Sequence, residues 1–189
     1  MRIPDMEGMV VSPSHEELSR AIDESWIYTV SSLCAASPKA VQQNEPDMTI
    51  CSSGYSNSLL NGVLGARFTS ESMAERTEHA ISFFRDKGLP MTFFVGPCCT
   101  PAELDDHLLH RGLAPGWARP GMAVGLDTVG RVQSPDGLEI CRVDDEESLR
   151  ACARTFARGF GTGEDAIGWL NTLVMGFGYG PGERGFWAT

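Results

Sequence analysis

The sequence predicts an α/β layer fold in which helices flank a mixed sheet. Two observations predict it. Short apolar segments bounded by turn residues, typical of strands, recur from residue 47 to residue 126, and amphipathic segments with helical spacing lie before and between them. Each such helix has one apolar face that a sheet must cover. We expect a first domain over residues 1–130 and a second, incomplete domain over residues 131–189.

The charge balance excludes two classes of partner. The chain of 189 residues carries 15 Lys+Arg against 25 Asp+Glu, a formal charge of -10, which repels nucleic-acid phosphates and anionic lipid. We therefore expect no nucleic acid and no membrane partner. No apolar run reaches the roughly 20 residues of a membrane span, and the first residues lack a signal-peptide pattern, so a cytoplasmic protein is predicted.

The six cysteines are expected to be free thiols. They are too few and too scattered for a disulfide scaffold in a chain of this length. Cys98 and Cys99 are adjacent, whereas zinc-binding pairs are usually separated by two residues. His107 and His110 lie three residues apart, but no third ligand is in view, so a solvated helix face is favoured over a metal site. No metal site is predicted.

The first third of the chain predicts a long helix followed by two strands. From Glu16 to about Ala36, apolar residues recur every three or four positions. These residues are Leu18, Ile22, Trp26, Val30 and Leu33. A polar stretch follows, and then strands are expected at residues 48–51 and 59–68. The turn residues 52–54 part them, so the two strands should be neighbours.

The middle third predicts two further helices and two further strands. Residues 72–75 spell a capping box for a helix that Gly88 ends, and residues 91–97 read as a buried strand. Thr100 and Pro101 are a typical helix start, with Leu104 and Leu108 facing inward, and another strand is expected at residues 122–126.

Residues 127–137 have the composition of a linker, after which the pattern restarts. A strand is expected at residues 138–143, followed by a helix with an apolar stripe, a second helix, and the start of a strand at residues 184–189. The stripe comprises Leu149, Cys152, Phe156 and Phe160, and the second helix carries Ile167, Leu170, Val174 and Phe177. These elements alone do not close a core, so we expect an exposed apolar patch over residues 149–177 and self-association of the chain.

Residues 158–163, Arg-Gly-Phe-Gly-Thr-Gly, match the Arg-x-x-Gly-x-Gly pattern by which acetyltransferases hold the pyrophosphate of acetyl-CoA. Such a loop needs a strand that delivers it to a helix start, whereas the preceding residues have helical periodicity. A turn between two helices is therefore the favoured interpretation.

The run of residues 72–127 resembles the later half of a GNAT-superfamily acetyltransferase. It has the order helix, strand, helix and strand, and the second helix ends in the family's Leu-x-x-x-Gly-Leu pattern, residues 108–113. Residues 138–143 and the acidic residues 144–147 then resemble the first strand and helix of a second GNAT domain. The resemblance implies a GNAT-like mixed sheet with flanking helices, a truncated second domain, and a parent N-acetyltransferase that uses acetyl-CoA and a small-molecule amine.

The first copy departs from the family at the cofactor loop. Residues 68–72, Phe-Thr-Ser-Glu-Ser, stand where a glycine-rich loop is expected, and Glu71 would repel a pyrophosphate. The second copy stops before its own loop. We therefore assign no catalytic and no cofactor-binding residue, and expect this chain to be inactive alone. By resemblance Phe160 and Trp169 are the substrate-pocket candidates, with packing the favoured role for both. The alternative is a noncatalytic module that binds a small molecule or a partner.

Overall fold

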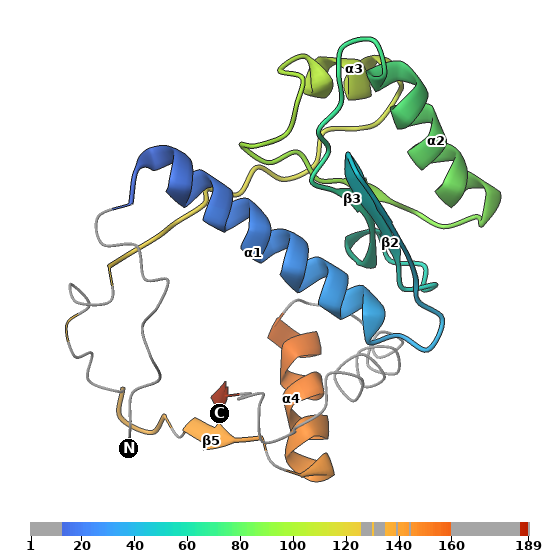
Figure 1. Cartoon of the computed structure of the whole chain (residues 1–189). Helices are drawn as coiled ribbons and strands as arrows, with labels where there is room; N and C mark the ends of the chain where they lie inside the picture. The colour runs from blue at the N-terminus through green and yellow to red at the C-terminus, as the bar shows by residue number, and fades with distance from the viewer. Residues whose placement is uncertain are drawn as a thin grey trace.

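The computed structural model describes residues 13–125, 130, 135–138, 140–143, 145–159 and 186–188. Its elements are, in chain order, α1 (His15–Ala35), β1 (Val41–Glu45), β2 (Met48–Ser52), the short 3-10 helix η1 (Ser58–Leu60), β3 (Asn61–Leu64), α2 (Met73–Asp86), β4 (Thr92–Phe93), α3 (Leu104–His110), β5 (Ile140–Arg142), α4 (Glu146–Gly159) and β6 (Phe186–Ala188). The chain is a mixed α/β protein, as predicted (Figure 1).

A four-stranded mixed sheet in the order β1-β2-β3-β4 forms the centre of the first part. β1 pairs with β2 and β2 with β3 in antiparallel fashion, whereas β4 runs parallel to β3. The parallel register places Gly62 opposite Thr92. Because parallel neighbours need a crossover connection, α2 links β3 to β4.

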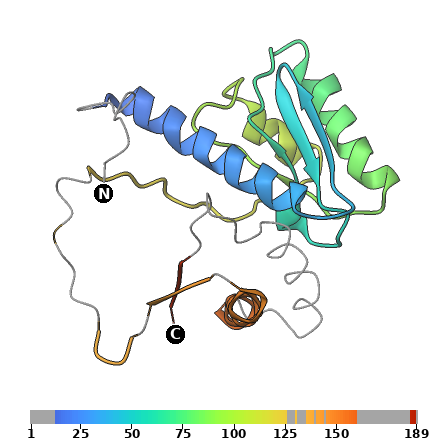
Figure 2. The same cartoon turned by 60° about the horizontal axis from the view of Figure 1, so that its bottom comes forward.

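The sheet has one helical layer on each face, because successive residues of a strand point to opposite sides. On one face Ile50 and Val63 pack with α2 and α3 in a cluster that includes Phe84. On the other face Cys51 and Leu64 pack with α1. Figure 2 shows the sheet between α1 and α2. The predicted layer arrangement is therefore confirmed for this part of the chain.

The helices α2 and α3 end in the same hydrogen-bonded motif. At the end of α3 the Leu113 N–H donates to the Leu108 carbonyl (3.1 Å) and the Gly112 N–H to the Leu109 carbonyl (3.0 Å). Gly112 has a φ of +87°, and Gly88 after α2 has +62°. This is the Schellman arrangement, in which glycine takes the left-handed conformation. The Leu-x-x-x-Gly-Leu pattern thus has a local physical reason, a helix end with a buried leucine.

Three element predictions in the first part were wrong. The Ser72 side chain makes no capping hydrogen bond to α2, so the capping box is absent. α3 begins at Leu104 and not near Thr100, because Thr100 forms a parallel bridge with Arg67. Residues 121–125 form no strand, and Met122 there is 87% exposed.

Strand lengths also differ from the predictions. The expected strand at residues 59–68 is divided into η1 and β3, and β4 spans only Thr92–Phe93. β1 was missed because all its residues but Val41 are polar and most are exposed, as suits the edge of a sheet. β2 and the pairing of β2 with β3 are confirmed.

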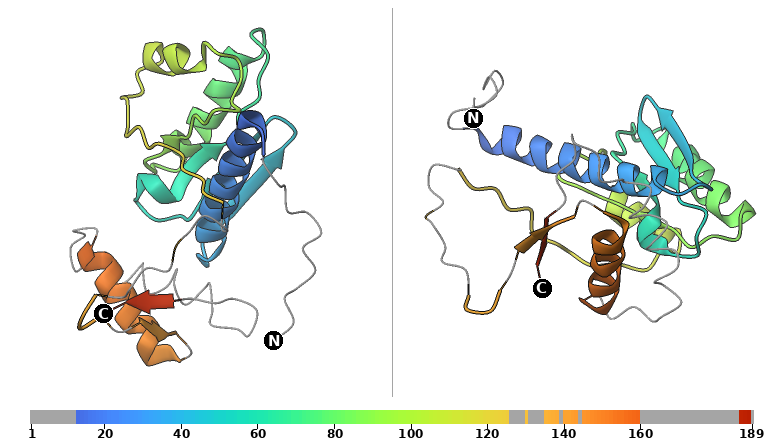
Figure 3. Two further views of the ribbon diagram at one scale, coloured as in Figure 1. Left: turned by 90° about the vertical axis from the view of Figure 1, so that its left-hand side faces the viewer. Right: turned by 90° about the horizontal axis from the view of Figure 1, so that it is seen from below.

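In the second part, the predicted strand, helix and strand start are present as β5, α4 and β6. β5 and β6 pair antiparallel, and Figure 3 shows them grouped with α4 apart from the four-stranded sheet. The buried face of α4 comprises Leu149, Ala153 and Ala157. Leu149 of the predicted stripe is therefore buried, whereas Phe156 is 46% exposed, in keeping with the expected exposed apolar patch. The expected second helix and most of the predicted apolar patch lie outside the described residues.

Candidate cofactor site at the start of α2

The resemblance places a phosphate-binding loop between β3 and α2. In the structure this connection runs over residues 65–72 and leads from the end of a strand to the start of a helix. Helix starts expose backbone N–H groups that bind anions, so the position is right for a cofactor loop. Whether these N–H groups are free decides what the site can do.

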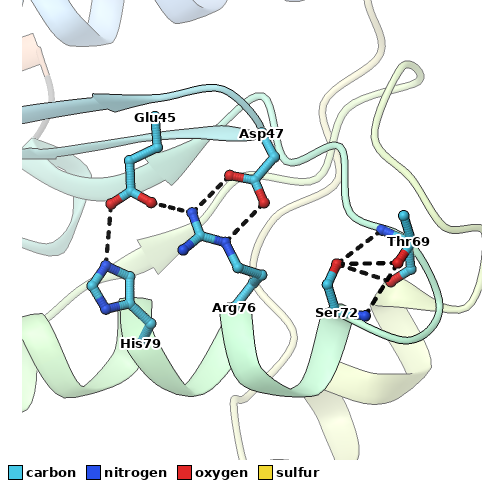
Figure 4. Close-up of polar contacts among 6 residues, drawn as sticks. All are labelled: Glu45, Asp47, Thr69, Ser72, Arg76 and His79. Carbon is cyan, nitrogen blue, oxygen red and sulfur yellow. Dashed lines mark hydrogen bonds and ion pairs between the residues drawn. The ribbon is translucent and has the colours of Figure 1, made fainter.

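Hydrogen bonds within the chain use several backbone N–H groups at the start of α2 (Figure 4). The Thr69 N–H donates to Ser72 Oγ (3.1 Å), and the Ser72 N–H donates to Thr69 Oγ1 (3.2 Å). The Met73 N–H donates to the Thr69 carbonyl (2.9 Å). These three N–H groups are therefore satisfied without a ligand, and a phosphate would have to displace Thr69 and Ser72 to reach them.

Glu71 adds a negative charge at the same position. Hydrogen bonds from its own backbone N–H and from the Thr69 side chain lower the pKa of its carboxyl group, so that it is ionised at neutral pH. The side chain is exposed at the helix start, where a carboxylate is favourable for the helix itself. The same charge opposes the approach of a pyrophosphate.

The first cation in α2 is also engaged. Arg76 binds Asp47 through two hydrogen bonds, Nε to Oδ2 (2.8 Å) and Nη2 to Oδ1 (2.7 Å), and its Nη2 also contacts Glu45 (Figure 4). His79, one turn later, lies with Nε2 3.1 Å from Oε1 of Glu45. We call Glu45, Asp47, Arg76 and His79 the α2 polar cluster.

The α2 polar cluster is an ion-paired contact and not a free anion site. The Arg76 hydrogen bond, followed by that of His79, lowers the pKa of Glu45, and the hydrogen bond to Asp47 is the main factor that raises the pKa of Arg76. The side chains of Glu45, Asp47 and Arg76 are all half-buried. With two carboxylates around one guanidinium, the cluster does not attract another anion, and it ties α2 to the turn between β1 and β2.

Aromatic side chains fill the seam between the two parallel strands. The Phe94 N–H donates to the Val63 carbonyl (2.9 Å), which places the Phe94 ring over Gly62. A Cβ added at Gly62 would lie 2.6 Å from that ring. Trp26 of α1 packs edge-on against Phe94, with the ring centroids 5.7 Å apart. Beside Gly62, the β3–β4 seam therefore has no room for an inserted ligand.

The predicted substrate-pocket residues, Phe160 and Trp169, lie outside the part of the chain that the structure describes, as do the last four residues of the Arg158–Gly163 pattern. Arg158 itself lies in the last turn of α4, which confirms that the pattern begins within a helix and not after a strand. His110 Nδ1 contacts the Asp106 carbonyl oxygen (2.6 Å), and His107 is half-buried on the same helix. Over the described residues, no three His, Cys, Asp or Glu side chains gather as metal ligands.

Sequence reasoning missed the α2 polar cluster. A partial signal exists, because Arg76 and His79 are three residues apart and therefore share a helix face. Glu45 and Asp47 flank Pro46, which makes an acidic turn. Nothing in the local sequence pairs the acidic turn with this helix face, because Arg76 lies 29 positions after Asp47.

Comparison with models of protein families, with curated proteins and with solved structures finds no match to this chain. Among the described residues there is no helix of the length and apolarity needed to cross a membrane.

Proposed function

We propose that residues 13–125 are a non-catalytic GNAT-like domain. In this proposal it is the first of two copies in an N-acetyltransferase that transfers acetyl from acetyl-CoA to a small-molecule amine, and the chain alone is inactive. The observation that supports the non-catalytic part is the start of α2, where the N–H groups of Thr69 and Ser72 already donate to each other's side chains.

The order of elements supports the GNAT-like part of the proposal. The resemblance predicts helix, strand and helix over residues 72–112, and α2, β4 and α3 follow in that order. Leu104 and Leu108 face the core as the motif requires, with 1% and 6% exposure. The expected strand after α3 is not present at residues 121–125, so the support stops at α3.

The proposal of a second copy rests on the restart of the pattern after the linker. β5 is followed by α4, whose first turn contains Glu146 and Glu147, in the order that the resemblance predicts for a first strand and a first helix. A tandem arrangement gives the first domain a supporting role, because catalysis needs only one copy with a working cofactor loop.

Calorimetric titration of the 189-residue chain with acetyl-CoA tests the proposal. We expect no measurable heat, and no acetylated product when a panel of primary amines is added and analysed by mass spectrometry. Micromolar binding that is lost in Gly161→Val but kept in Gly116→Val would overturn the proposal, because it would place the cofactor loop at residues 158–163. Gly116 is the matched control, since a side chain there meets nothing within 4 Å.

A further inference from the structure

Two cysteines meet in the core between α1 and the sheet. Cys34 lies in the last turn of α1 and Cys51 is the fourth of the five residues of β2, and they are 1% and 0% exposed. Their Sγ atoms are 3.3 Å apart, and the Cys34 Sγ also lies 3.1 Å from the Leu60 carbonyl oxygen. Val30 and Leu64 belong to the same cluster, so the thiol pair is part of the apolar contact between α1 and the sheet.

We propose that Cys34 and Cys51 are a redox-sensitive pair that a small-molecule disulfide such as oxidised glutathione converts into an intramolecular disulfide. The two side chains come from facing layers and already touch, so the bond needs an approach of only about 1.3 Å, to the usual S–S length of about 2.05 Å. The other cysteines in the described side chains, at positions 98, 99 and 152, are on other elements.

The reaction balances as two thiol–disulfide exchanges. The Cys34 thiolate attacks one sulfur of oxidised glutathione, which forms a mixed disulfide and releases one glutathione thiolate. The Cys51 thiolate then attacks the Cys34 sulfur of that mixed disulfide, which forms the Cys34–Cys51 bond and releases the second glutathione. The two thiol protons pass to the two glutathione thiolates. The protein loses two electrons and glutathione gains them.

Access to the buried pair comes from the end of α1. Helix ends open at low free-energy cost, and Cys34 is only one residue from the last helical residue. In the closed state, the hydrogen bond to Cys51 and the burial of the thiol raise the pKa of Cys34, which keeps it protonated and unreactive. Opening of the last turn returns Cys34 to water, where an ordinary thiol reacts. Oxidation should therefore be slow and should follow local opening.

The cross-link would change how α1 is held. In the reduced state, apolar packing and a few hydrogen bonds, including that of Cys34 to the Leu60 carbonyl, hold the C-terminal end of α1 on the sheet. The disulfide would close a loop between positions 17 apart that contains β1, and α1 could then no longer leave β2. The disulfide would therefore tether α1 to the sheet under oxidising conditions, and reduction would remove this tether.

Tryptic mapping of the whole chain tests the proposal directly. Cleavage after Arg20, Lys39 and Arg67 places Cys34 in peptide 21–39 and Cys51 in peptide 40–67, each with no other cysteine. After incubation with oxidised glutathione at pH 8, we expect these peptides as one species that is two hydrogens lighter than their sum. We expect the Tm to rise by on the order of 10 °C and to return after dithiothreitol.

Cysteine-to-alanine variants distinguish the Cys34–Cys51 pair from the other thiols. Cys34→Ala and Cys51→Ala should each abolish the cross-linked species and the rise in Tm, whereas Cys98→Ala combined with Cys99→Ala should leave both unchanged. If Cys34→Ala or Cys51→Ala fails to fold, the tryptic peptide map of the oxidised wild-type protein still tests the proposal. Absence of the 21–39 to 40–67 species from oxidised, folded protein would overturn the proposal. A cross-link that lowers the Tm would contradict the stabilising tether between α1 and the sheet.

Discussion

Arg76 and Asp47 form a two-point ion pair that joins α2 to the turn between β1 and β2. Nε and Nη2 of Arg76 lie 2.8 and 2.7 Å from the two carboxylate oxygens of Asp47. Glu45, at the end of β1, binds the same guanidinium. A planar guanidinium suits this geometry, and the pair fixes the hairpin turn relative to the helix that follows the candidate cofactor loop.

Replacement of Arg76 should destabilise the protein more than replacement of an exposed arginine. In Arg76→Gln, Glu45 and Asp47 remain as neighbouring half-buried carboxylates, so we expect a loss of about 1–3 kcal/mol in the free energy of unfolding. Arg20→Gln is the control, because its pair with Glu16 is exposed, and it should lose less than about 0.5 kcal/mol. Urea unfolding measures both. Equal losses would show that the α2 polar cluster adds nothing.

The stability of the protein should depend on pH through Glu45. Arg76 first, and then His79, lowers the pKa of Glu45 in the folded state. Its stabilising contribution is therefore fully present above the unfolded value of about 4.3 and is lost as the pH falls through the folded value. The difference in unfolding free energy between wild type and Glu45→Gln should shrink from pH 6 to pH 3. A constant difference over that range would contradict the prediction.

A side chain at Gly62 should disrupt the β3–β4 seam. In Gly62→Ala the new Cβ would lie 2.6 Å from the Phe94 ring and 2.9 Å from the Thr92 carbonyl oxygen, so we expect a loss of about 1–3 kcal/mol. Gly116→Ala is the control and should be near neutral, because nothing lies within 4 Å. The double variant Gly62→Ala/Phe94→Leu should recover part of the loss in a double-mutant cycle. Additive effects would show that Phe94 does not fill the seam.

The end of α3 should depend on the left-handed backbone of Gly112. With φ at +87° and open space around its Cβ position, Gly112→Ala has a conformational cost only, about 1 kcal/mol. Gly112→Asn should cost less, because asparagine adopts this conformation more readily. Thermal unfolding of the two variants checks the order. If Gly112→Ala and Gly112→Asn lose the same free energy of unfolding, Gly112 does not stabilise the end of α3 through its left-handed conformation.

Local patterns predicted the parts of the fold that local physics determines. The period of apolar residues predicts α1 and the buried side of α3, and Gly88 and Gly112 mark two helix ends. The capping box of Ser14 and Glu17 at the start of α1, with the Glu17 N–H 3.2 Å from Ser14 Oγ, was not predicted although it is equally local.

The features that the sequence did not predict depend on contacts between residues that lie far apart in the chain. Thr100 has the sequence of a helix cap, but its hydroxyl donates to the Phe68 carbonyl (3.1 Å) and its backbone pairs beside Arg67, 33 positions earlier in the chain. β1 was missed because an exposed edge strand needs no apolar alternation. The α2 polar cluster was missed for the same reason as the Thr100 bridge, since Glu45 and Asp47 meet Arg76 only in the folded chain.

Titration of ¹⁵N-labelled protein with acetyl-CoA, followed by the amide resonances of Thr69, Glu71 and Ser72, tests the central claim most directly. We expect the start of α2 to be closed to a pyrophosphate because the N–H groups of Thr69 and Ser72 already donate to each other's side chains. We predict that these three resonances keep their positions up to millimolar acetyl-CoA. Saturable shifts at these amides would show that a phosphate displaces the two side chains, and would contradict the account.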